Sequence, residues 1–467
     1  MSTATQERLR LALPGAVVVA WFAASLGVWF LLRAPGALKT TEVVVVAGSG
    51  LVAFAVLYAV GVRRGGRDEA AAAGPLPARL PLSLSRGQLS ALVAAGAVYY
   101  LGRTAGNLAP LVSVGWDTAD PVCSLTRAYV ARQESFVAGG DSSPLQSALN
   151  LVGVLQLCTI PLLVLAWGSL HRWARVIGVA AVSAFVVSWL LSGAVKGIAD
   201  TLLVVGASAL VWLLRPRSDG APAYRRAAIV AALGAGGLLF VLAASTILGA
   251  RVINPAACFA PTPPPGTGTS TGGSGGTGTG TGTAVTPVAV AQGRGTSVVL
   301  DYVTQGYSGL GASLTQEFVW TKGSGTSPGL ARVLFFVPTD AEPYPVRAER
   351  ATGWPALGKW QTLYPWVASD VTWVGAVLVV GLLGLGLGAS WRRALVGPTG
   401  YLAGTWFATL ATIAVYVPLN NQPVAATSSV IGLLTLGAVT VWVVVARRRD
   451  EQGDAVAEPG PVDARIR

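Results

Sequence analysis

The sequence predicts an all-α integral membrane protein of about ten transmembrane helices with one large extracytoplasmic loop between spans 7 and 8. Hydrophobic residues make up 52% of the 467 residues and charged residues only 12%, which is typical of a membrane protein. Several apolar runs approach or exceed the roughly 18 residues that a helix needs to cross a bilayer. The remaining polar residues gather in one long segment, Arg251–Asp370.

Seven apolar runs precede the long segment and three follow it. The predicted spans are Pro14–Leu32, Val43–Val62, Leu89–Val112, Leu149–Leu170, Val176–Gly193, Ile198–Leu214, Ala227–Leu248, Val371–Ser390, Tyr401–Val417 and Ser428–Val445. The first run is followed by Arg33 and lacks a small-residue cleavage site, so we interpret it as a retained helix rather than a signal peptide.

The net charge of +12 reports topology rather than nucleic-acid binding. The basic residues stand at the ends of the predicted spans, and ten spans place all of these groups on one side. They are Arg8, Arg10, Arg63, Arg64, Arg67, Arg79, Arg86, Arg172, Arg175, Arg215, Arg217, Arg225, Arg226, Arg392, Arg393, Arg447, Arg448 and Arg449. The positive-inside rule then predicts a multi-pass protein with both termini in the cytoplasm and the long segment outside. Membrane lipids are the expected partners of these charges, and no nucleic acid is expected.

The amino-acid composition indicates the kind of organism that makes the protein and separates the chain into regions. Only four of the 33 basic residues are Lys, and Ala, Gly and Val are abundant, which suggests a GC-rich bacterial genome and therefore the plasma (inner) membrane. The Gly/Thr-rich tract has no side chains that could build a core, so we expect a flexible linker there. The expected regions are a membrane domain over 1–250, a loop over 251–370 (linker 261–284, ordered part with short interfacial helices 285–370), a membrane domain over 371–446 and a cytoplasmic tail over 447–467.

Cysteine and histidine usage limits the chemistry. Cys158 lies in a predicted span, whereas Cys123 and Cys258 fall in the two outer loops, where a disulfide between them is a prediction. The one histidine, His171, falls in a short cytoplasmic loop. Without a His/carboxylate cluster, a CxxC pair or a phosphate-binding loop, the sequence predicts no metal and no cofactor.

Three charged residues are predicted near the outer leaflet, where charge is costly and therefore informative. Arg103 lies late in the third span, and Lys196 and Asp200 stand in the turn between the fifth and sixth spans. Lys196 and Asp200 have the i,i+4 spacing of a local ion pair, and Arg103 has the length to reach the headgroups. The alternative is that Arg103 and Lys196 bind an anionic ligand, together with Lys322 and Arg332 on the same face.

The long segment holds a second group of polar residues. Asp301, Tyr302, Thr304, Gln305 and Tyr307 supply a carboxylate, hydroxyls, an amide and aromatic rings within seven positions. This mixture suits carbohydrate, whose hydroxyls need donors and acceptors and whose ring faces stack on aromatic side chains. A loop that satisfies its own polar groups would have the same composition.

Three short runs carry a resemblance to a known family. Tyr302-Val-Thr-Gln-Gly-Tyr-Ser-Gly-Leu310 and Phe318-Val-Trp-Thr-Lys-Gly-Ser-Gly-Thr-Ser327 resemble the motif pair YLTQGYYGL and WTYGIGNS of bacterial oligosaccharide repeat-unit polymerases, the O-antigen polymerase-like (Wzy-like) membrane proteins. Ser192-Gly-Ala-Val-Lys-Gly-Ile-Ala-Asp200 is similar to that family's GTxKGIxD turn. The departures of the chain from the pattern include Ser308, Lys322, Ser324 and Thr326.

The resemblance implies a glycosyltransferase-type enzyme that transfers a growing chain from undecaprenyl pyrophosphate onto the next lipid-linked repeat at the outer face. Chain-length regulator or flippase proteins are further implied partners. Under this hypothesis the cations contact pyrophosphate, the polar residues of the first motif line the sugar site, and Asp301 orients or deprotonates the acceptor hydroxyl. The implied catalytic residues are Asp301, Arg103 and Lys196, and the implied substrate-binding residues are Tyr302, Gln305, Tyr307, Lys322, Arg332 and Asp200.

Three other classes remain open on the sequence. A multispan polyprenyl-phosphate-sugar glycosyltransferase would resemble its relatives in an acidic motif in the first outer loop, but Arg33–Glu42 offers only Glu42. A transporter or lipid flippase would show charged or broken helices near the midplane, and the sequence predicts few. A non-catalytic scaffold for envelope assembly, with the long segment as a docking surface, is compatible with the composition.

Overall fold

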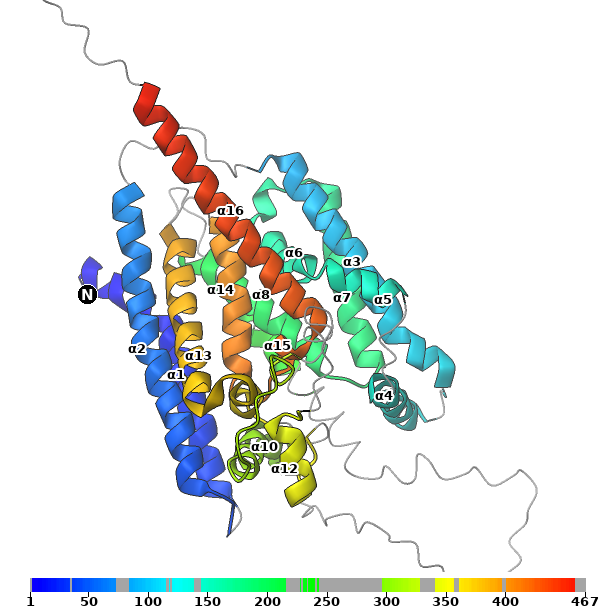
Figure 1. Cartoon of the computed structure of the whole chain (residues 1–467). Helices are drawn as coiled ribbons and strands as arrows, with labels where there is room; N and C mark the ends of the chain where they lie inside the picture. Colours follow the sequence, from blue (N-terminus) through cyan, green and yellow to red (C-terminus); the bar gives the residue numbers. More distant parts are fainter. Residues whose placement is uncertain are drawn as a thin grey trace, which may run out of the picture.

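The described part of the chain is built from helices and connections alone. A computed structural model describes residues 2–33, 36–72, 84–114, 117, 120–137, 144–215, 296–327, 341–356, 361–396 and 400–457, with scattered residues between 227 and 242. The helices are α1 (Thr3–Leu32), α2 (Thr40–Ala72), α3 (Arg86–Val114), α4 (Pro121–Val137), α5 (Pro144–Leu151), α6 (Val154–Leu165), η2 (Trp167–Ser169), α7 (Arg172–Leu191), α8 (Lys196–Leu214), α10 (Thr296–Ser313), α12 (Tyr344–Thr352), α13 (Leu363–Val396), α14 (Gly400–Tyr416), α15 (Gln422–Ala425) and α16 (Thr427–Ala457). Figure 1 shows their arrangement.

Six of these helices are long and apolar enough to cross a membrane, which makes this a multi-pass, all-helical membrane protein. They are α1, α2, α7, α8, α13 and α16, and the pair α5–α6 counts as a seventh span although it bends by 60°. Helices α3 and α14 cover two further predicted spans without meeting the same criteria. Only scattered residues of the predicted seventh span, Ala227–Leu248, are described, so ten spans stay a prediction.

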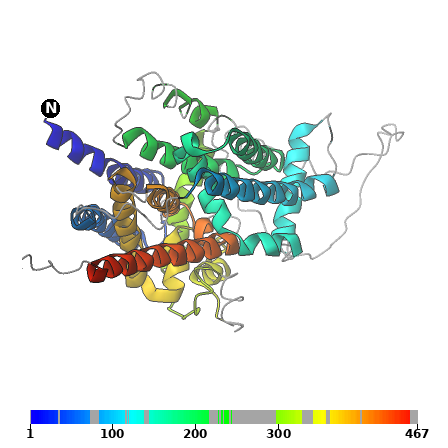
Figure 2. The same cartoon turned by 90° about the horizontal axis from the view of Figure 1, so that it is seen from above.

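Two groups of helices flank a central set. One group consists of α1, α2 and α13, and the other of α3 and α7, with α6, α8 and α14 between them (Figures 1 and 2). Each group has its own apolar core, centred on Phe54, Leu387 and Trp391 in the first and on Tyr100 and Phe185 in the second. Helix α6 is the common neighbour, because it packs against α3, α8, α14 and α16.

Helices α2 and α13 approach each other closely because glycines face the partner backbone. A Cβ added at Gly61 would lie 2.1 Å from the carbonyl oxygen of Leu385. Across the same interface, a Cβ at Gly384 would lie 2.4 Å from the Phe54 oxygen and one at Gly388 would lie 2.3 Å from the Tyr58 oxygen. Small residues four positions apart are the usual means by which membrane helices pack at short range.

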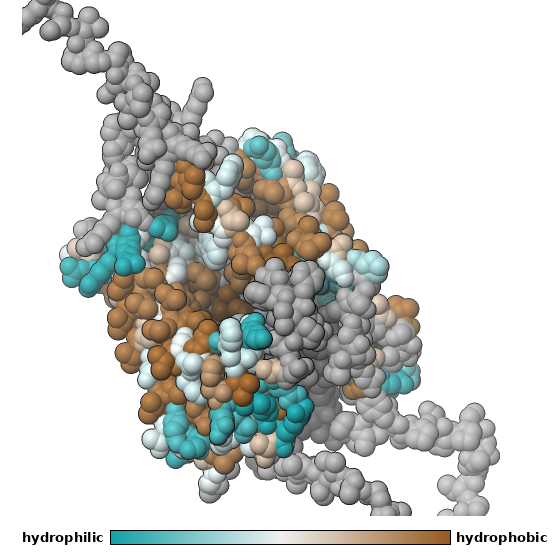
Figure 3. Space-filling view, viewed as in Figure 1, coloured by the Kyte–Doolittle hydropathy of each residue, from teal (hydrophilic) through white to brown (hydrophobic). Residues whose placement is uncertain are grey.

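The two ends of the bundle differ in composition. At one end Trp391 donates to the carbonyl of Arg10 at 3.2 Å, Arg392 lies beside Gly66 and Arg215 lies beside Gly400, so arginines of several helix ends gather there. Helices α10, α12 and α15 lie at the opposite end (Figure 1). The space-filling view shows apolar side chains over the flank between the ends and hydrophilic ones around α12 (Figure 3).

Helix α13 contains a break at Val371–Thr372, where the predicted eighth span begins. Val371 has φ −132° and Thr372 has φ 67°, so the helical conformation is interrupted at both residues. The part before the break, Leu363–Ser369, is buried. A β-branched residue with positive φ is strained, and Asp370, two residues before Thr372, is anchored by hydrogen bonds to residues 321–326.

We predict that Gly384→Leu destabilises the protein, because its side chain must displace the backbone of α2. Overpacking of this kind costs about 1–3 kcal/mol, so the apparent melting temperature in detergent, followed by size-exclusion chromatography, should fall. Gly48→Leu is the matched control, since a Cβ at Gly48 on α2 meets nothing within 4 Å. Equal melting temperatures for the two variants would contradict this account of the interface.

Candidate functional site

Helix α10 carries the first motif and buries most of it against α1. Tyr307 is 2% exposed, its hydroxyl shares a hydrogen bond of 2.9 Å with Ser25, and its ring centroid lies 5.8 Å from that of Trp29. Burial raises the pKa of the Tyr307 hydroxyl above its ordinary range, against the opposing effect of the Ser25 hydrogen bond. Tyr307 is therefore a neutral packing residue in this structure, and its expected role in sugar binding is not tested by any contact.

The glycines of the same motif are positions of close backbone approach. A Cβ at Gly306 would lie 2.6 Å from the carbonyl oxygen of Pro418, and one at Gly311, the residue after the motif, would lie 2.5 Å from the Leu38 oxygen. The motif thus seats α10 against the α1–α2 connection and the chain that follows α14. Gln305 is half-buried, and the side chains of Asp301 and Tyr302 lie outside the described residues.

The second motif forms a tight loop around one carboxylate, Asp370. Oδ1 accepts from the Thr321 hydroxyl and from the backbone N–H groups of Gly323 at 2.7 Å and Gly325 at 3.3 Å. Oδ2 accepts from the N–H group and the hydroxyl of Thr326, at 2.7 and 2.6 Å. The glycines of this run let successive N–H groups converge on an anion. Sequence reasoning missed Asp370, since its five donors come from more than 40 positions away.

The cations expected on this loop are not among the partners of Asp370. Lys322 has φ 53° and an exposed side chain, so the loop turns it outward. Arg332 lies outside the described residues. The structure therefore leaves the expected contact of either residue with pyrophosphate untested.

Lys196 and Asp200 form the local ion pair that their spacing allows, with a third member from another helix. Nζ of Lys196 lies 2.8 Å from Oδ2 of Asp200, and the two side chains are 28% and 26% exposed. The hydroxyl of Tyr416, at the end of α14, donates to Oδ1 of Asp200 at 2.6 Å. The tyrosine was not predicted, because only the fold brings the end of α14 to the beginning of α8.

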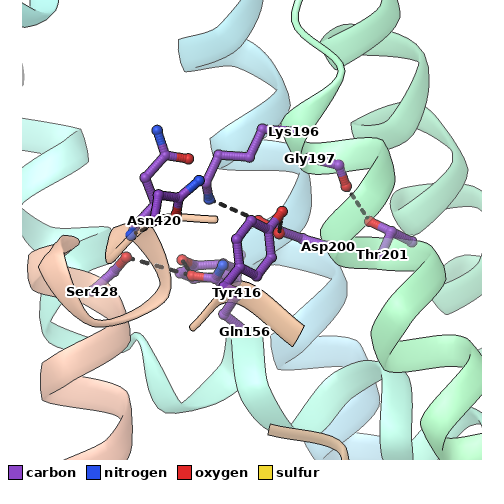
Figure 4. A network of polar contacts seen from close by, with 10 residues as sticks. Gln156, Lys196, Gly197, Asp200, Thr201, Tyr416, Asn420 and Ser428 are labelled. Carbon is purple, nitrogen blue, oxygen red and sulfur yellow. Dashed lines mark hydrogen bonds and ion pairs between the residues drawn. The ribbon is translucent and has the colours of Figure 1, made fainter. Parts of the chain in front are cut away.

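A buried amide stands beside this ion pair. Asn420 is 2% exposed, and its Oδ1 accepts from the N–H of Gln422 at 2.9 Å, while its Nδ2 has no partner among the described residues. The backbone N–H of Asn420 donates to the carbonyl of Tyr416 at 2.8 Å, which places Asn420 one turn beyond the tyrosine that binds Asp200 (Figure 4). Ser428, at the beginning of α16, extends the network to Gln156 at 3.4 Å.

Arg103 lies in a second polar cluster that shares Gln156 with the first. Its guanidinium donates to the hydroxyl of Tyr99 at 3.0 Å, to Oε1 of Gln146 at 2.6 Å and to Oδ1 of Asn150 at 2.5 Å. Tyr99 in turn donates to Oε1 of Gln156 at 2.8 Å. All three acceptors of Arg103 are neutral, so its positive charge is held in place without being compensated by these contacts.

The break between α5 and α6 positions the amide acceptors of Arg103 and Gln156. Gln146 and Asn150 lie on α5, and Gln156 lies in the first turn of α6. A Cβ at Gly153, in the break, would lie 2.0 Å from the carbonyl oxygen of Ser428. This glycine therefore lets α16 begin directly against the bend, next to Gln156.

The connection from α14 to α16 joins the motif region to the charged residues. On one side, the N–H of Leu363 donates to the oxygen of Val417 at 2.9 Å and Ser327 of the second motif donates to Ala425 at 3.5 Å. On the other side, Tyr416 and Ser428 reach Asp200 and Gln156. Residues 416–428 are thus the segment through which the predicted parts of the site meet.

Neither the cysteines nor a metal-binding group contributes to the polar site in the described part of the chain. Cys123 is disulfide-bonded and Cys158 is free, while Cys258 lies outside the described residues, so its predicted pairing stays a prediction. Within the described ranges, no group of three or more His, Cys, Asp or Glu side chains could hold a metal ion.

No family model, curated protein or solved structure matches this chain. The resemblance to repeat-unit polymerases therefore rests on the quoted runs alone. What the structure defines is a multi-pass helical membrane protein with a half-buried polar site where α3, α6, α8, α14 and α16 meet.

We predict that Asp370→Asn loosens the second motif, because an amide nitrogen would face the two donors of Thr326. A hydrogen bond to a charged acceptor contributes about 1.5–3 kcal/mol, so amide hydrogen exchange over residues 321–326 should accelerate about tenfold or more. Glu317→Gln is the matched control, since Glu317 is an exposed acid close to the same loop. Unchanged exchange in Asp370→Asn would show that the glycines alone shape the loop.

Proposed function

We propose that this protein polymerises undecaprenyl-pyrophosphate-linked oligosaccharide repeat units into a cell-surface polysaccharide at the outer face of the bacterial plasma membrane. The observation that carries the proposal is the environment of Arg103. Its guanidinium has three neutral acceptors and forms no salt bridge with an acid of the described ranges. Such a charge within a helical membrane bundle suits an anionic ligand.

The diphosphate of a lipid carrier meets this requirement. Transfer of the growing chain breaks the bond between its anomeric carbon and the diphosphate, so negative charge develops on the leaving oxygen. A guanidinium fixed in advance by Gln146, Asn150 and Tyr99 stabilises that charge without having to reorganise. The hydrophobic flanks of the bundle would leave the lipid tail in the bilayer while its headgroup reaches Arg103.

The surroundings of Arg103 also supply groups that suit sugar hydroxyls. Side-chain groups from α6, α8, α14 and α16 form two sets of hydrogen bonds here, Lys196–Asp200–Tyr416 and Ser428–Gln156 (Figure 4). Carbohydrate recognition needs such mixed donors and acceptors. The resemblance of the three sequence runs to repeat-unit polymerases favours the same substrate class.

A lipid-linked oligosaccharide flippase is the second candidate, and the bent span α5–α6 favours it. Broken helices with polar residues at the break are common at transporter binding sites. The two candidates differ in what accumulates when the gene is deleted. Loss of long polymer with single repeats still displayed outside supports the polymerase, whereas lipid-linked repeats trapped on the cytoplasmic side support the flippase.

We predict that Arg103→Ala and Lys196→Ala abolish polymer while the protein remains in the membrane. Loss of one preorganised donor to a developing charge typically lowers a rate by about 100- to 1,000-fold. Arg103→Lys should be nearly as impaired, because an ammonium group cannot reach three separate acceptors as the guanidinium does. Polymer length is measured by gel electrophoresis of surface polysaccharide, with protein abundance measured by immunoblotting.

Lys39→Gln is the control for these substitutions. Lys39 is an exposed lysine whose partner is Glu42, at 2.9 Å, and it makes no contact with the polar network around Asp200. Polymer in this variant should be indistinguishable from wild type. Full polymer in Arg103→Ala would rule out the proposed pyrophosphate site.

A further inference from the structure

We propose that Asn420, Lys196 and Asp200 form a binding site for a neutral sugar hydroxyl, and that this hydroxyl is the acceptor of the transfer reaction. The inference rests on the proposed function and deepens it. It separates the two charged clusters by role, with the anionic leaving group at Arg103 and the neutral acceptor sugar at the Lys196–Asp200 pair.

The first support is the unused donor of Asn420. Its side chain is 2% exposed, and a buried N–H group without a partner costs about 1–3 kcal/mol. The hydrogen bond from Gln422 N to Oδ1 fixes the amide so that Nδ2 is the end left over, and Figure 4 shows Asn420 next to Lys196. A buried donor held in this way needs an oxygen acceptor from outside the described residues.

The second support is the remaining hydrogen-bonding capacity of the ion pair. Lys196 carries three N–H donors and gives one to Asp200, while the Asp200 carboxylate has about four lone-pair positions and receives Lys196 and Tyr416. Helix α8 also begins here with no side chain capping its N-terminus. Free donors and a free acceptor position therefore lie within one half-buried site.

Charge decides which ligand fits. Lys196 and Asp200 compensate each other at 2.8 Å, so the site has no net charge to attract a diphosphate, and the carboxylate would repel one. A hydroxyl has the complementary pattern, because its oxygen accepts from Asn420 or Lys196 and its O–H donates to Asp200. Arg103, whose acceptors are neutral, remains the place for the anion.

The same arrangement gives Asp200 a chemical role that the sequence assigned to Asp301. The acceptor O–H transfers its proton to the Asp200 carboxylate as its oxygen forms a bond with the anomeric carbon of the growing chain. The bond from that carbon to the diphosphate oxygen breaks, and the diphosphate leaves with the electron pair. Tyr416 and Lys196 orient the carboxylate throughout.

Chemical labelling of Lys196 tests the ligand assignment directly. The full-length protein is purified in detergent and treated with a limiting amount of acetic anhydride, and acetylation of Lys196 and Lys39 is compared by mass spectrometry. The probes are the repeat-unit oligosaccharide released from its lipid by mild acid, which lacks the diphosphate, and inorganic pyrophosphate. The oligosaccharide should slow acetylation of Lys196 severalfold and leave Lys39 unchanged, and pyrophosphate should protect neither.

Asn420→Asp and Asn420→Leu should remove most of this protection. Asn420→Asp keeps the acceptor for Gln422 and replaces the Nδ2 donors with a carboxylate oxygen, so it tests the amide even if the leucine variant fails to fold. Gln316→Leu is the control, since its amide lies elsewhere at the same end of the bundle and contacts Thr315. Undiminished protection in Asn420→Asp, protection by pyrophosphate, or no protection of the wild type would each overturn the proposal.

This measurement is separate from the test of polymerisation. If gene deletion leaves the surface polysaccharide unchanged but the oligosaccharide still protects Lys196, the polymerase assignment fails and the hydroxyl site stands. If deletion abolishes polymer but Lys196 is protected by pyrophosphate, the function stands and the assignment of the two clusters is reversed.

Discussion

Backbone polar groups at the breaks between helices must find partners at the edge of a membrane, and this requirement organises the site. Three breaks lie together at one end of the bundle: the α5–α6 bend, the interruption of α13 at Val371–Thr372 and the connection from α14 to α16. An unsatisfied N–H or C=O group there would cost several kcal/mol. Asp370 meets this need for the second motif with five accepted hydrogen bonds.

The hydrogen bonds that satisfy the backbone at one helix break also bring residues of the other breaks close together. The loop held by Asp370 reaches Ala425 through Ser327, and the chain around Ala425 leads from Asn420 to Ser428. Ser428 contacts Gln156 of α6, and Tyr416, just before this stretch, contacts Asp200 of α8. The polar side chains therefore gather because the backbone groups at the breaks need hydrogen-bond partners. This requirement gives a physical reason for the polar site at this end of the bundle.

The charges of the site differ in how they are balanced, and this difference supports a division of labour. Lys196 and Asp200 neutralise each other on one helix turn, whereas Arg103 is fixed by neutral amides and a hydroxyl. A transferase that joins two lipid-linked sugars must handle one anionic leaving group and one neutral acceptor. Two polar clusters of unlike charge balance suit those two tasks.

The sequence by itself determined the class of protein, its helices and the local ion pair. Apolar runs of sufficient length predict membrane helices whatever the tertiary structure, and i,i+4 spacing predicts the Lys196–Asp200 contact, because both depend on neighbours along the chain. The motif runs also fall where α10 and the Asp370-bound loop lie. Whether the protein has ten spans, and what the motif residues bind, remain predictions.

Only the tertiary structure decided which residues share the site. Asp370, Tyr416 and Gln156 meet partners that lie 44, 216 and 272 positions away in the sequence, and no periodicity or local pattern encodes such contacts. It also showed that Tyr307 of α10 is buried and shares a hydrogen bond with Ser25 of α1, while its predicted role in sugar binding stays a prediction. Interactions between neighbours in the sequence determine the helices of this chain. The polar site depends on which helix ends the packing of the bundle brings together.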